Sequence, residues 1–251
     1  MLIQILIENE GCAPYLSEHG LSLCLCHNGK RFLLDAGTSG NFLQNAQLLG
    51  CPVEELDTAV LSHGHFDHAD GFPALFERNG KIKVYARPAV MQPQYGHNGR
   101  YIGLCDSLLH EYADRFDLSD QMREIAPGLW LVPDTIDHEQ SLVAETEDGL
   151  VVMNCCCHAG GDHIVADILQ RFPGKKVRAL VGGLHLMGPG GVSTLGKHPD
   201  EVRALARRLT VELGVEGVYT GHCTGSPAFA LLCEAAPGKI HTIHSGDTLE
   251  F

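Results

Sequence analysis

Short apolar runs recur along the chain and alternate with segments whose apolar residues repeat every three or four positions. Runs of about four to eight residues rich in Leu, Ile and Val are typical of strands. Asn28-Gly29 separates two such runs and gives the strongest hairpin signal. The pattern predicts strands over residues 2–7, 21–27, 31–34, 57–61, 82–86, 128–132, 141–145, 150–154, 176–181, 215–220, 240–243 and 248–251.

The amphipathic segments predict helices between these strands. The clearest helix follows Pro199, a residue favoured in the first helical turn, and ends at Gly214. Helices interleaved with strands indicate a layered α/β fold rather than an all-β fold. Further helices are predicted over residues 39–49, 71–78, 161–172 and 227–235, the last one capped by Ser226.

Residues 88–122 show weak periodicity and carry many polar and aromatic side chains, among them Tyr95 and His97. Such a segment is typical of an insertion or a lid over a site, although an ordinary surface excursion explains it equally well. The chain contains no Pro/Ser-rich linker or low-complexity tract. Residues 1–251 are therefore predicted to form a single domain.

Composition narrows the class of protein. The 251 residues are 44% hydrophobic and 20% charged, as in globular proteins. Eighteen basic residues against 31 acidic ones give a net charge of −13, which argues against binding to nucleic acid or to an anionic membrane surface. The apolar run at residues 1–7 lacks a basic leader and a cleavage site, so we expect a strand there and a cytoplasmic protein.

The ten cysteines lie mostly inside apolar runs, as Cys24 and Cys26 do, and three follow one another at Cys155-Cys156-Cys157. The sequence has no Cys-x-x-Cys pair. This usage predicts reduced, buried thiols in a reducing compartment.

The most informative stretch is His63-Gly64-His65-Phe66-Asp67-His68, directly after the apolar run at residues 58–61. Alternate side chains at a strand end face the same way, so His63 and His65 are predicted to face one cation. Asp67 and His68 would turn toward a second cation. Imidazole and carboxylate together suit zinc first, and also manganese or iron. The alternative, a chance His-rich surface loop, explains this spacing poorly.

Three later predicted strands end near a histidine with glycine close by: His158, His185 and His222. The C-terminal edge of strands is where ligands bind in open α/β sheets, and glycine allows a close approach to an ion. We expect His158 and His222 to be metal ligands, and His185 to be either a ligand or a substrate contact. Thiolate ligation by Cys157 or Cys223 is an alternative.

Together these residues resemble the metallo-β-lactamase superfamily, whose hallmark is His-x-His-x-Asp-His. The likeness is to the branch named for the methanopterin-pathway dihydropterin-ribofuranosylaminobenzene-phosphate synthase. The matching motifs cover most of the chain and are fewest over residues 88–135. They lie at residues 18–22, 34–37, 45–46, 61–68, 157–160, 182–186 and 220–225.

The resemblance implies an αββα sandwich with a two-metal site at the C-terminal edge of its strands. Many relatives bridge the two ions with an aspartate at the strand end before the last histidine, whereas this chain has Gly182-Gly183-Leu184-His185 there, without a carboxylate. By the superfamily pattern, the first ion would be held by His63, His65 and His158, and the second by Asp67, His68 and His222.

These features predict a metal-dependent hydrolase in which a metal-activated hydroxide attacks phosphorus or a carbonyl carbon. The substrate would be a small molecule, and a phosphate ester or a pterin-linked compound fits the resemblance. Asp67 would orient the attacking oxygen, and His185 would donate a proton or hold a phosphate. Further candidate substrate contacts are His19, Arg100 and Tyr101, while Asp35 would support a ligand histidine or simply form a turn.

Two other functions remain open at this point. An iron-dependent oxidoreductase could use the same histidines, and a non-catalytic metal or redox sensor could use Cys155-Cys156-Cys157. The predicted partner is a small-molecule substrate, which could be anionic. Whether the chain forms a homo-oligomer is left open.

Overall fold

The computed structural model describes residues 1–96 and 98–251, so His97, in the predicted insertion, lies outside the described residues. The chain forms two compact units. The first unit comprises Met1–Met122, His138–Gln140 and His244–Glu250, and the second comprises Arg123–Asp137, Ser141–Ile243 and Phe251. The single domain over residues 1–251 stays a prediction.

The first unit contains a seven-stranded sheet in the order β16-β1-β2-β3-β4-β5-β6. The predicted hairpin is confirmed, because β2 and β3 are antiparallel and Asn28 and Gly29 both have positive φ, as a tight two-residue turn requires. From β3 to β6 the neighbouring strands are parallel. The strands are β1 (Leu2–Ile7), β2 (Ser22–His27), β3 (Lys30–Leu34), β4 (Thr58–Val60), β5 (Val84–Ala86), β6 (Phe116–Leu118) and β16 (Thr248–Glu250).

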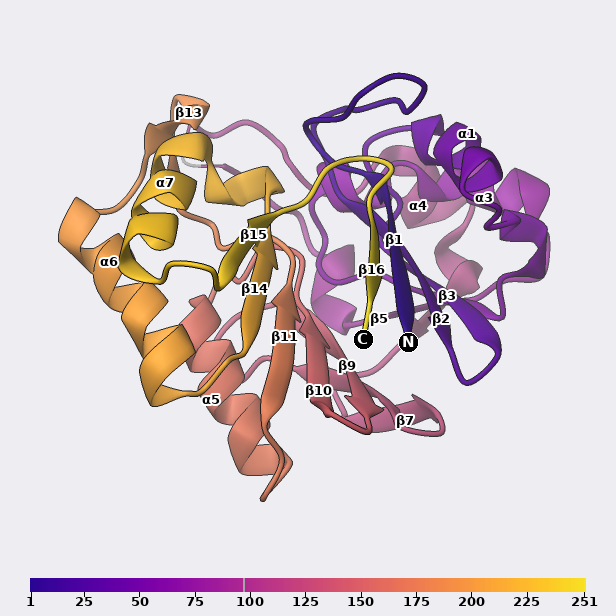
Figure 1. Cartoon of the computed structure of the whole chain (residues 1–251). Helices are drawn as coiled ribbons and strands as arrows, with labels where there is room; N and C mark the ends of the chain where they lie inside the picture. The colour runs from indigo at the N-terminus through magenta and orange to yellow at the C-terminus, as the bar shows by residue number, and fades with distance from the viewer. Residues whose placement is uncertain (97) are drawn as a thin grey trace. The chain divides into compact units, whose positions relative to one another are not determined.

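The core of the first unit lies between its helices and this sheet. Phe42 and Phe72 are fully buried and belong to one apolar cluster with Leu33 and Leu61 from the sheet side. Figure 1 shows α1 and α3 together beside the N-terminal strands. The helices are α1 (Asn41–Leu48), α2 (Phe66–Ala69), α3 (Phe72–Arg78) and α4 (Asp106–His110), with 3₁₀ turns η1 (Val53–Glu55), η2 (Pro88–Met91) and η3 (Ala113–Arg115).

Residues 88–122 are partly built into this unit. Val90, Leu104 and Leu108 are buried in its core, and β6 forms the edge of its sheet. A lid function for the segment stays a prediction.

The second unit contains another seven-stranded sheet, in the order β15-β14-β11-β10-β9-β8-β7. β10, β11, β14 and β15 run parallel, so their C-terminal ends share one edge. The strands are β7 (Arg123–Ala126), β8 (Leu129–Pro133), β9 (Gln140–Thr146), β10 (Gly149–Met153), β11 (Val177–Val181), β14 (Gly217–Thr220) and β15 (Ile240–Thr242), with a separate ribbon of β12 (Met187–Gly188) and β13 (Gly191–Leu195).

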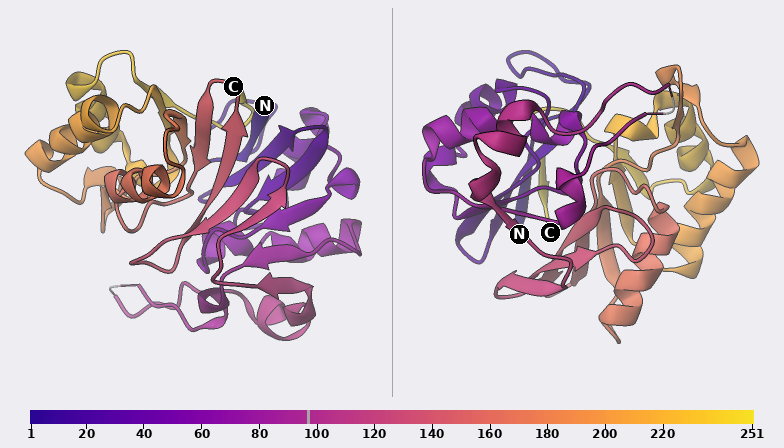
Figure 2. Two further views of the ribbon diagram at one scale, coloured as in Figure 1. Left: turned by 90° about the horizontal axis from the view of Figure 1, so that it is seen from below. Right: turned by 180° about the vertical axis from the view of Figure 1, so that it is seen from behind.

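The helices of the second unit lie on one face of its sheet, as Figure 2 shows. They are α5 (Gly161–Arg171), α6 (Pro199–Arg207) and α7 (Ser226–Ala235). The helix predicted after Pro199 is confirmed: His198 and Glu201 form a capping box at its start, and the π-helical turn η4 (Arg208–Glu212) extends it.

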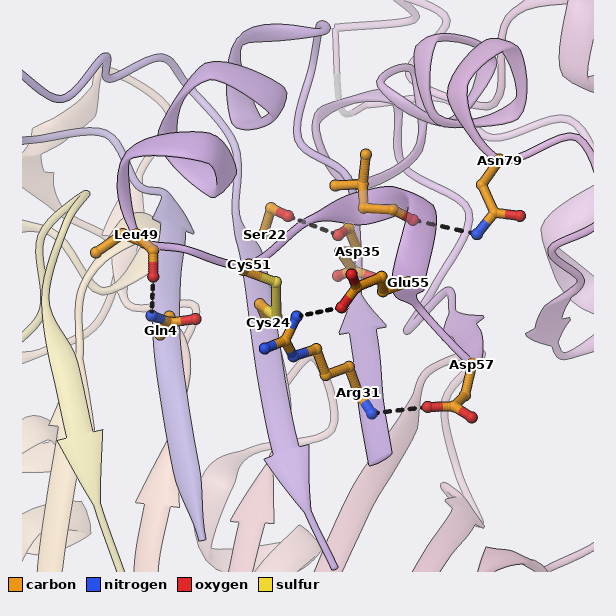
Figure 3. The surroundings of a disulfide bond; sticks show 11 residues. Gln4, Ser22, Cys24, Arg31, Asp35, Leu49, Cys51, Glu55, Asp57 and Asn79 are labelled. Atoms are coloured by element: carbon orange, nitrogen blue, oxygen red, sulfur yellow. Dashed lines mark hydrogen bonds and ion pairs between the residues drawn. A yellow bond between two sulfur atoms is a disulfide. The ribbon is translucent and has the colours of Figure 1, made fainter. Parts of the chain in front are cut away.

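One disulfide, Cys24–Cys51, joins β2 to the chain just after α1 (Figure 3). The expectation that the thiols are reduced is wrong for this pair. Helix α1 packs against the sheet and carries Cys51 to Cys24 across 27 residues, a contact that local spacing does not reveal. Among the described residues, none of the helices has both the length and the apolar composition needed to span a bilayer.

Candidate metal centre

The four predicted ligands of the first unit lie close together. Val60 ends β4, His63 and His65 follow in the loop, and Asp67 and His68 lie in the short helix α2. The Nε2 atom of His63 is 3.0 Å from Nδ1 of His65, and the His63 and His68 ring centroids are 4.3 Å apart. Two ring nitrogens at that separation suit ligands of one cation, since zinc binds each nitrogen at about 2.0–2.1 Å.

The Asp35 carboxylate contacts residues of this cluster through hydrogen bonds. Its buried carboxylate accepts hydrogen bonds from the Ser62 backbone N–H at 2.7 Å and the Ser62 hydroxyl at 2.6 Å. The same carboxylate lies 2.7 Å from Nδ1 of His68. A donated Nδ1–H leaves Nε2 of His68 available to a metal ion, which is how metal-binding histidines are usually oriented. The predicted contact between Asp35 and a candidate ligand histidine is therefore present, while the role of His68 as a ligand stays a prediction.

Two residues near the cluster were missed by the sequence reasoning. The His138 ring lies 5.7 Å from that of His63 and 5.3 Å from that of His65. Glu139, fully buried, places Oε1 3.7 Å from Nδ1 of His63. The sequence signal was an acidic and an imidazole side chain next to each other before β9, without the glycine that marks the other strand ends.

The loop before β2 brings His19 against Asp67. Nε2 of His19 lies 3.2 Å from Oδ2 of Asp67, and half of the His19 side chain stays exposed. The close packing needs Gly20, because a Cβ there would lie 2.5 Å from the Asp67 carbonyl oxygen. Glu18 has a different role: its carboxylate accepts hydrogen bonds from the Ser39 backbone and hydroxyl just before α1.

Arg100 and Tyr101 differ in how they relate to this cluster. The Arg100 guanidinium lies over the Phe66 ring, 5.6 Å from its centroid. In the sequence, Phe66 stands between two predicted metal ligands. The Tyr101 hydroxyl donates to the Leu104 carbonyl at 2.8 Å, and burial raises the pKa of this phenol. Arg100 therefore lies beside α2, while the Tyr101 hydroxyl is engaged within its own loop.

In the second unit, His158, His185 and His222 follow the C-terminal ends of β10, β11 and β14, three neighbouring parallel strands. The His158 and His185 rings lie 4.3 Å apart. His185 and His222 both have positive φ, which is uncommon for residues with a side chain and concentrates at functional sites. The structure thus brings the strand-end histidines to one edge of this sheet.

A thiol pair lies beside these histidines. Sγ of Cys223 is 3.4 Å from Sγ of Cys156 and accepts a hydrogen bond from the His185 backbone N–H at 3.3 Å. Burial opposes ionisation of Cys223, but hydrogen bonds with the side chains of Cys156 and His185 hold the pKa of this thiol below its usual range. The side-chain hydrogen bond with Cys223, against burial, raises the pKa of His185. Of the three consecutive cysteines, Cys156 is the one placed against Cys223, a role that the sequence did not indicate.

A pocket of about 570 Å³ opens beside His158 and His185 within the second unit. Apolar side chains such as Leu184 line part of it. Its charged lining residues are of both signs: Lys197, Arg208, Asp162, Glu201 and Glu212. Arg208 is paired with Asp162 at 2.9 Å. The volume lies in the range of small-molecule sites.

Known proteins are similar to this chain in sequence and in fold. A family model described as the metallo-beta-lactamase superfamily matches residues 18–172. A 7,8-dihydropterin-6-methyl-4-(beta-D-ribofuranosyl)-aminobenzene-5'-phosphate synthase of Methanocaldococcus jannaschii is 27% identical, over 95% of this chain and 92% of that protein.

Two solved structures extend the comparison. The structure of Tm1679, described as a metal-dependent hydrolase of the beta-lactamase superfamily, is 30% identical, covers 100% of this chain and 99% of that one, and has a TM-score of 0.85. The structure of the metallo-beta-lactamase fold protein YhfI from Bacillus subtilis is 14% identical, covers 100% of this chain and 98% of that one, and has a TM-score of 0.64. At that identity the likeness shows the fold alone. The predicted fold class is confirmed.

Proposed function

Because the chain belongs to the metallo-β-lactamase superfamily, we propose that it is a metal-dependent hydrolase of a small-molecule substrate. The superfamily typically binds divalent metal ions. The observation that carries the proposal is the buried histidine cluster of the first unit, in which Asp35 orients His68 and Ser62 contacts His63. These donors and their hydrogen-bonded support fit a divalent cation of the zinc class.

We assign six residues as ligands of two ions, most simply zinc. Ions bound there would provide Lewis acidity and a hydroxide at neutral pH. The ligands are His63, His65 and His158 for one ion, and Asp67, His68 and His222 for the other.

The remaining groups bind and orient the substrate. Asp67 accepts from the attacking water and fixes its direction, and His19, 3.2 Å from that carboxylate, contacts the substrate on the exposed side. His185 lines the pocket of the second unit, where its ring donates a hydrogen bond or a proton to the substrate. Arg100 supplies a positive charge beside α2 for an anionic group of the substrate. Because the Tyr101 hydroxyl is hydrogen-bonded to the Leu104 carbonyl, Tyr101 contacts the substrate through its ring.

The Methanocaldococcus relative is named as the synthase of a pterin-linked phosphate compound, while Tm1679 is described as a metal-dependent hydrolase. A phosphate ester, with or without a pterin ring, is therefore the first substrate class to test. A phosphate ester of either kind needs positive charge near its phosphate group, and bound metal ions would provide that charge.

The test joins metal analysis to an activity panel. Purified protein is assayed for bound metal and for turnover of phosphoesters and lactones, before and after chelation, and in His63→Ala. We expect about two metals per chain, activity that chelation removes and added zinc restores, and no activity in His63→Ala with its melting temperature retained. His110→Ala, which changes an exposed histidine at the end of α4, is the matched control.

Full turnover after chelation would contradict the proposal. Iron as the bound metal, with substrate-dependent oxygen consumption, would favour the oxidoreductase instead. Metal-triggered binding of a partner without any turnover would favour a sensor.

A further inference from the structure

Cys156, His185 and Cys223 converge within the second unit, following the ends of β10, β11 and β14. One ligand atom from each residue lies within 4.8 Å of the other two. The two cysteines are buried, with 3% and 1% of their surface exposed. We propose that these three residues form a thiolate metal site for a thiophilic divalent cation of the zinc class.

The separations fit such an ion. Thiolates about 2.3 Å from a tetrahedral zinc lie roughly 3.7 Å apart. The Sγ atoms of Cys156 and Cys223 are 3.4 Å apart, so an opening of a few tenths of an ångström admits the ion. Two thiolates and one imidazole are a known zinc ligand set that leaves a fourth position for water or another group.

The backbone around the cluster is shaped for the sulfur of Cys223. A Cβ at Gly183 would lie 2.4 Å from that sulfur, so only glycine lets the strand end approach it this closely. The Leu184 N–H donates to the Thr224 hydroxyl at 2.9 Å, and the Leu186 N–H donates to the Cys223 carbonyl at 3.0 Å. These bonds on both sides of His185 fix its position relative to Cys223.

Bound as thiolates, the two cysteines would supply negative charge beside His185. Gly182 and Gly183 directly follow β11, and the space beside Gly183 is taken by the sulfur of Cys223. Thiolate is a softer donor than carboxylate and favours zinc over magnesium or calcium. The ring of His185 has two nitrogens, so one can bind this ion while the other faces the pocket.

The site needs residues of one unit only, and it does not depend on hydrolysis. Its test uses cobalt(II) as the probe, because thiolate ligation produces a sulfur-to-cobalt charge-transfer absorption that imidazole and carboxylate ligands do not. Metal-free full-length protein, kept reduced, is titrated with cobalt(II), and the near-ultraviolet absorption is followed. We expect the band in the wild type, and its loss in Cys156→Ser and in Cys223→Ser.

Cys233→Ser is the matched control, since Cys233 lies in the same unit on α7, away from the cluster. It should keep the full band. Circular dichroism checks that each variant is folded, and Cys156→Ala and Cys223→Ala replace any serine variant that is not. His185→Ala should keep the band but bind cobalt(II) more weakly.

A wild-type protein without a thiolate band, or a band that survives both Cys156→Ser and Cys223→Ser, overturns the proposal. A protein that shows the band but hydrolyses nothing would refute the proposed function and leave this site standing. A protein that shows metal-dependent hydrolysis but no thiolate band would support the proposed function and refute this site.

Discussion

Asp35→Asn replaces a buried carboxylate whose hydrogen-bond partners among the described residues are all donors: the Ser62 N–H, the Ser62 hydroxyl and Nδ1 of His68. Asn has the same shape and tolerates the positive φ of 59° at this position, so the backbone should be kept. It offers one acceptor oxygen and one NH₂ donor. Whichever way the amide turns, an NH₂ group faces a site that now holds an acceptor.

The two orientations have different costs. If the NH₂ group faces His68, that ring must accept at Nδ1 and carry its proton on Nε2, the atom assigned to the metal. If it faces the Ser62 N–H, a buried donor loses its partner, at about 1–3 kcal/mol. Loss of a carboxylate that supports a ligand histidine lowers metal affinity roughly 10- to 100-fold, or about 1.4–2.7 kcal/mol.

The assay is a competition for zinc between the protein and a chromophoric chelator, with melting temperature measured on the metal-free form. Asp57→Asn is the control, because its exposed carboxylate accepts from the Arg31 backbone N–H and lies outside the cluster. We expect weaker zinc binding in Asp35→Asn alone. Wild-type zinc affinity in Asp35→Asn would refute the claim that this carboxylate sets the ligand nitrogen of His68.

Three further predictions concern stability. Gly183→Ala should lower the free energy of unfolding by about 1–3 kcal/mol, because its Cβ would lie 2.4 Å from the Cys223 sulfur; chemical denaturation measures this, and an unchanged midpoint would contradict the packing. Cys24→Ser should cost about 3–4 kcal/mol under oxidising conditions, as expected for the loss of a crosslink across 27 residues, and nothing under strong reductant. The hydrogen bond from Lys175 lowers the pKa of Glu145 below its ordinary value, so the stabilisation is present above that value and is lost as pH falls through the folded-state pKa. The melting temperatures of the wild type and Glu145→Gln should therefore differ at neutral pH and converge on acidification; a constant difference would argue against the ion pair.

Much of the fold was predictable because residues close together in the sequence determine many of its elements. The apolar run at residues 2–7 is β1 over the same residues, and Asn28-Gly29 is the turn between β2 and β3. The helix after Pro199 begins there because Pro199 and the capping box favour it. The edge strands β6 and β7 were missed, since they are short and charged residues interrupt them, so neither forms an apolar run.

The candidate site divides in the same way. His63 and His68 were found because they lie within one motif after a strand. The contact between Asp35 and His68 spans 33 residues, and the Cys24–Cys51 disulfide spans 27, so neither follows from spacing. His138 reaches the cluster from a part of the chain whose neighbours in sequence belong mostly to the other unit.

The strand ends of the second unit show why local rules fail at such a place. Cys157, His185 and His222 all have φ near 50°, a conformation that residues with side chains rarely adopt and that sequence patterns assign to glycine. Glycines stand beside them instead, at positions where a Cβ would collide, as at Gly182 with the Asn154 carbonyl oxygen at 1.9 Å. The glycines provide room, and the residues with positive φ include the candidate functional residues His185 and His222. Such strain persists only where surrounding bonds fix it, as the Asn154 side chain does by accepting from the Cys157 N–H at 2.7 Å. Replacing Asn154 with Leu should therefore release this turn and weaken cobalt(II) binding at Cys156 and Cys223, and unchanged binding would show that the strained turn is not needed to position the thiols.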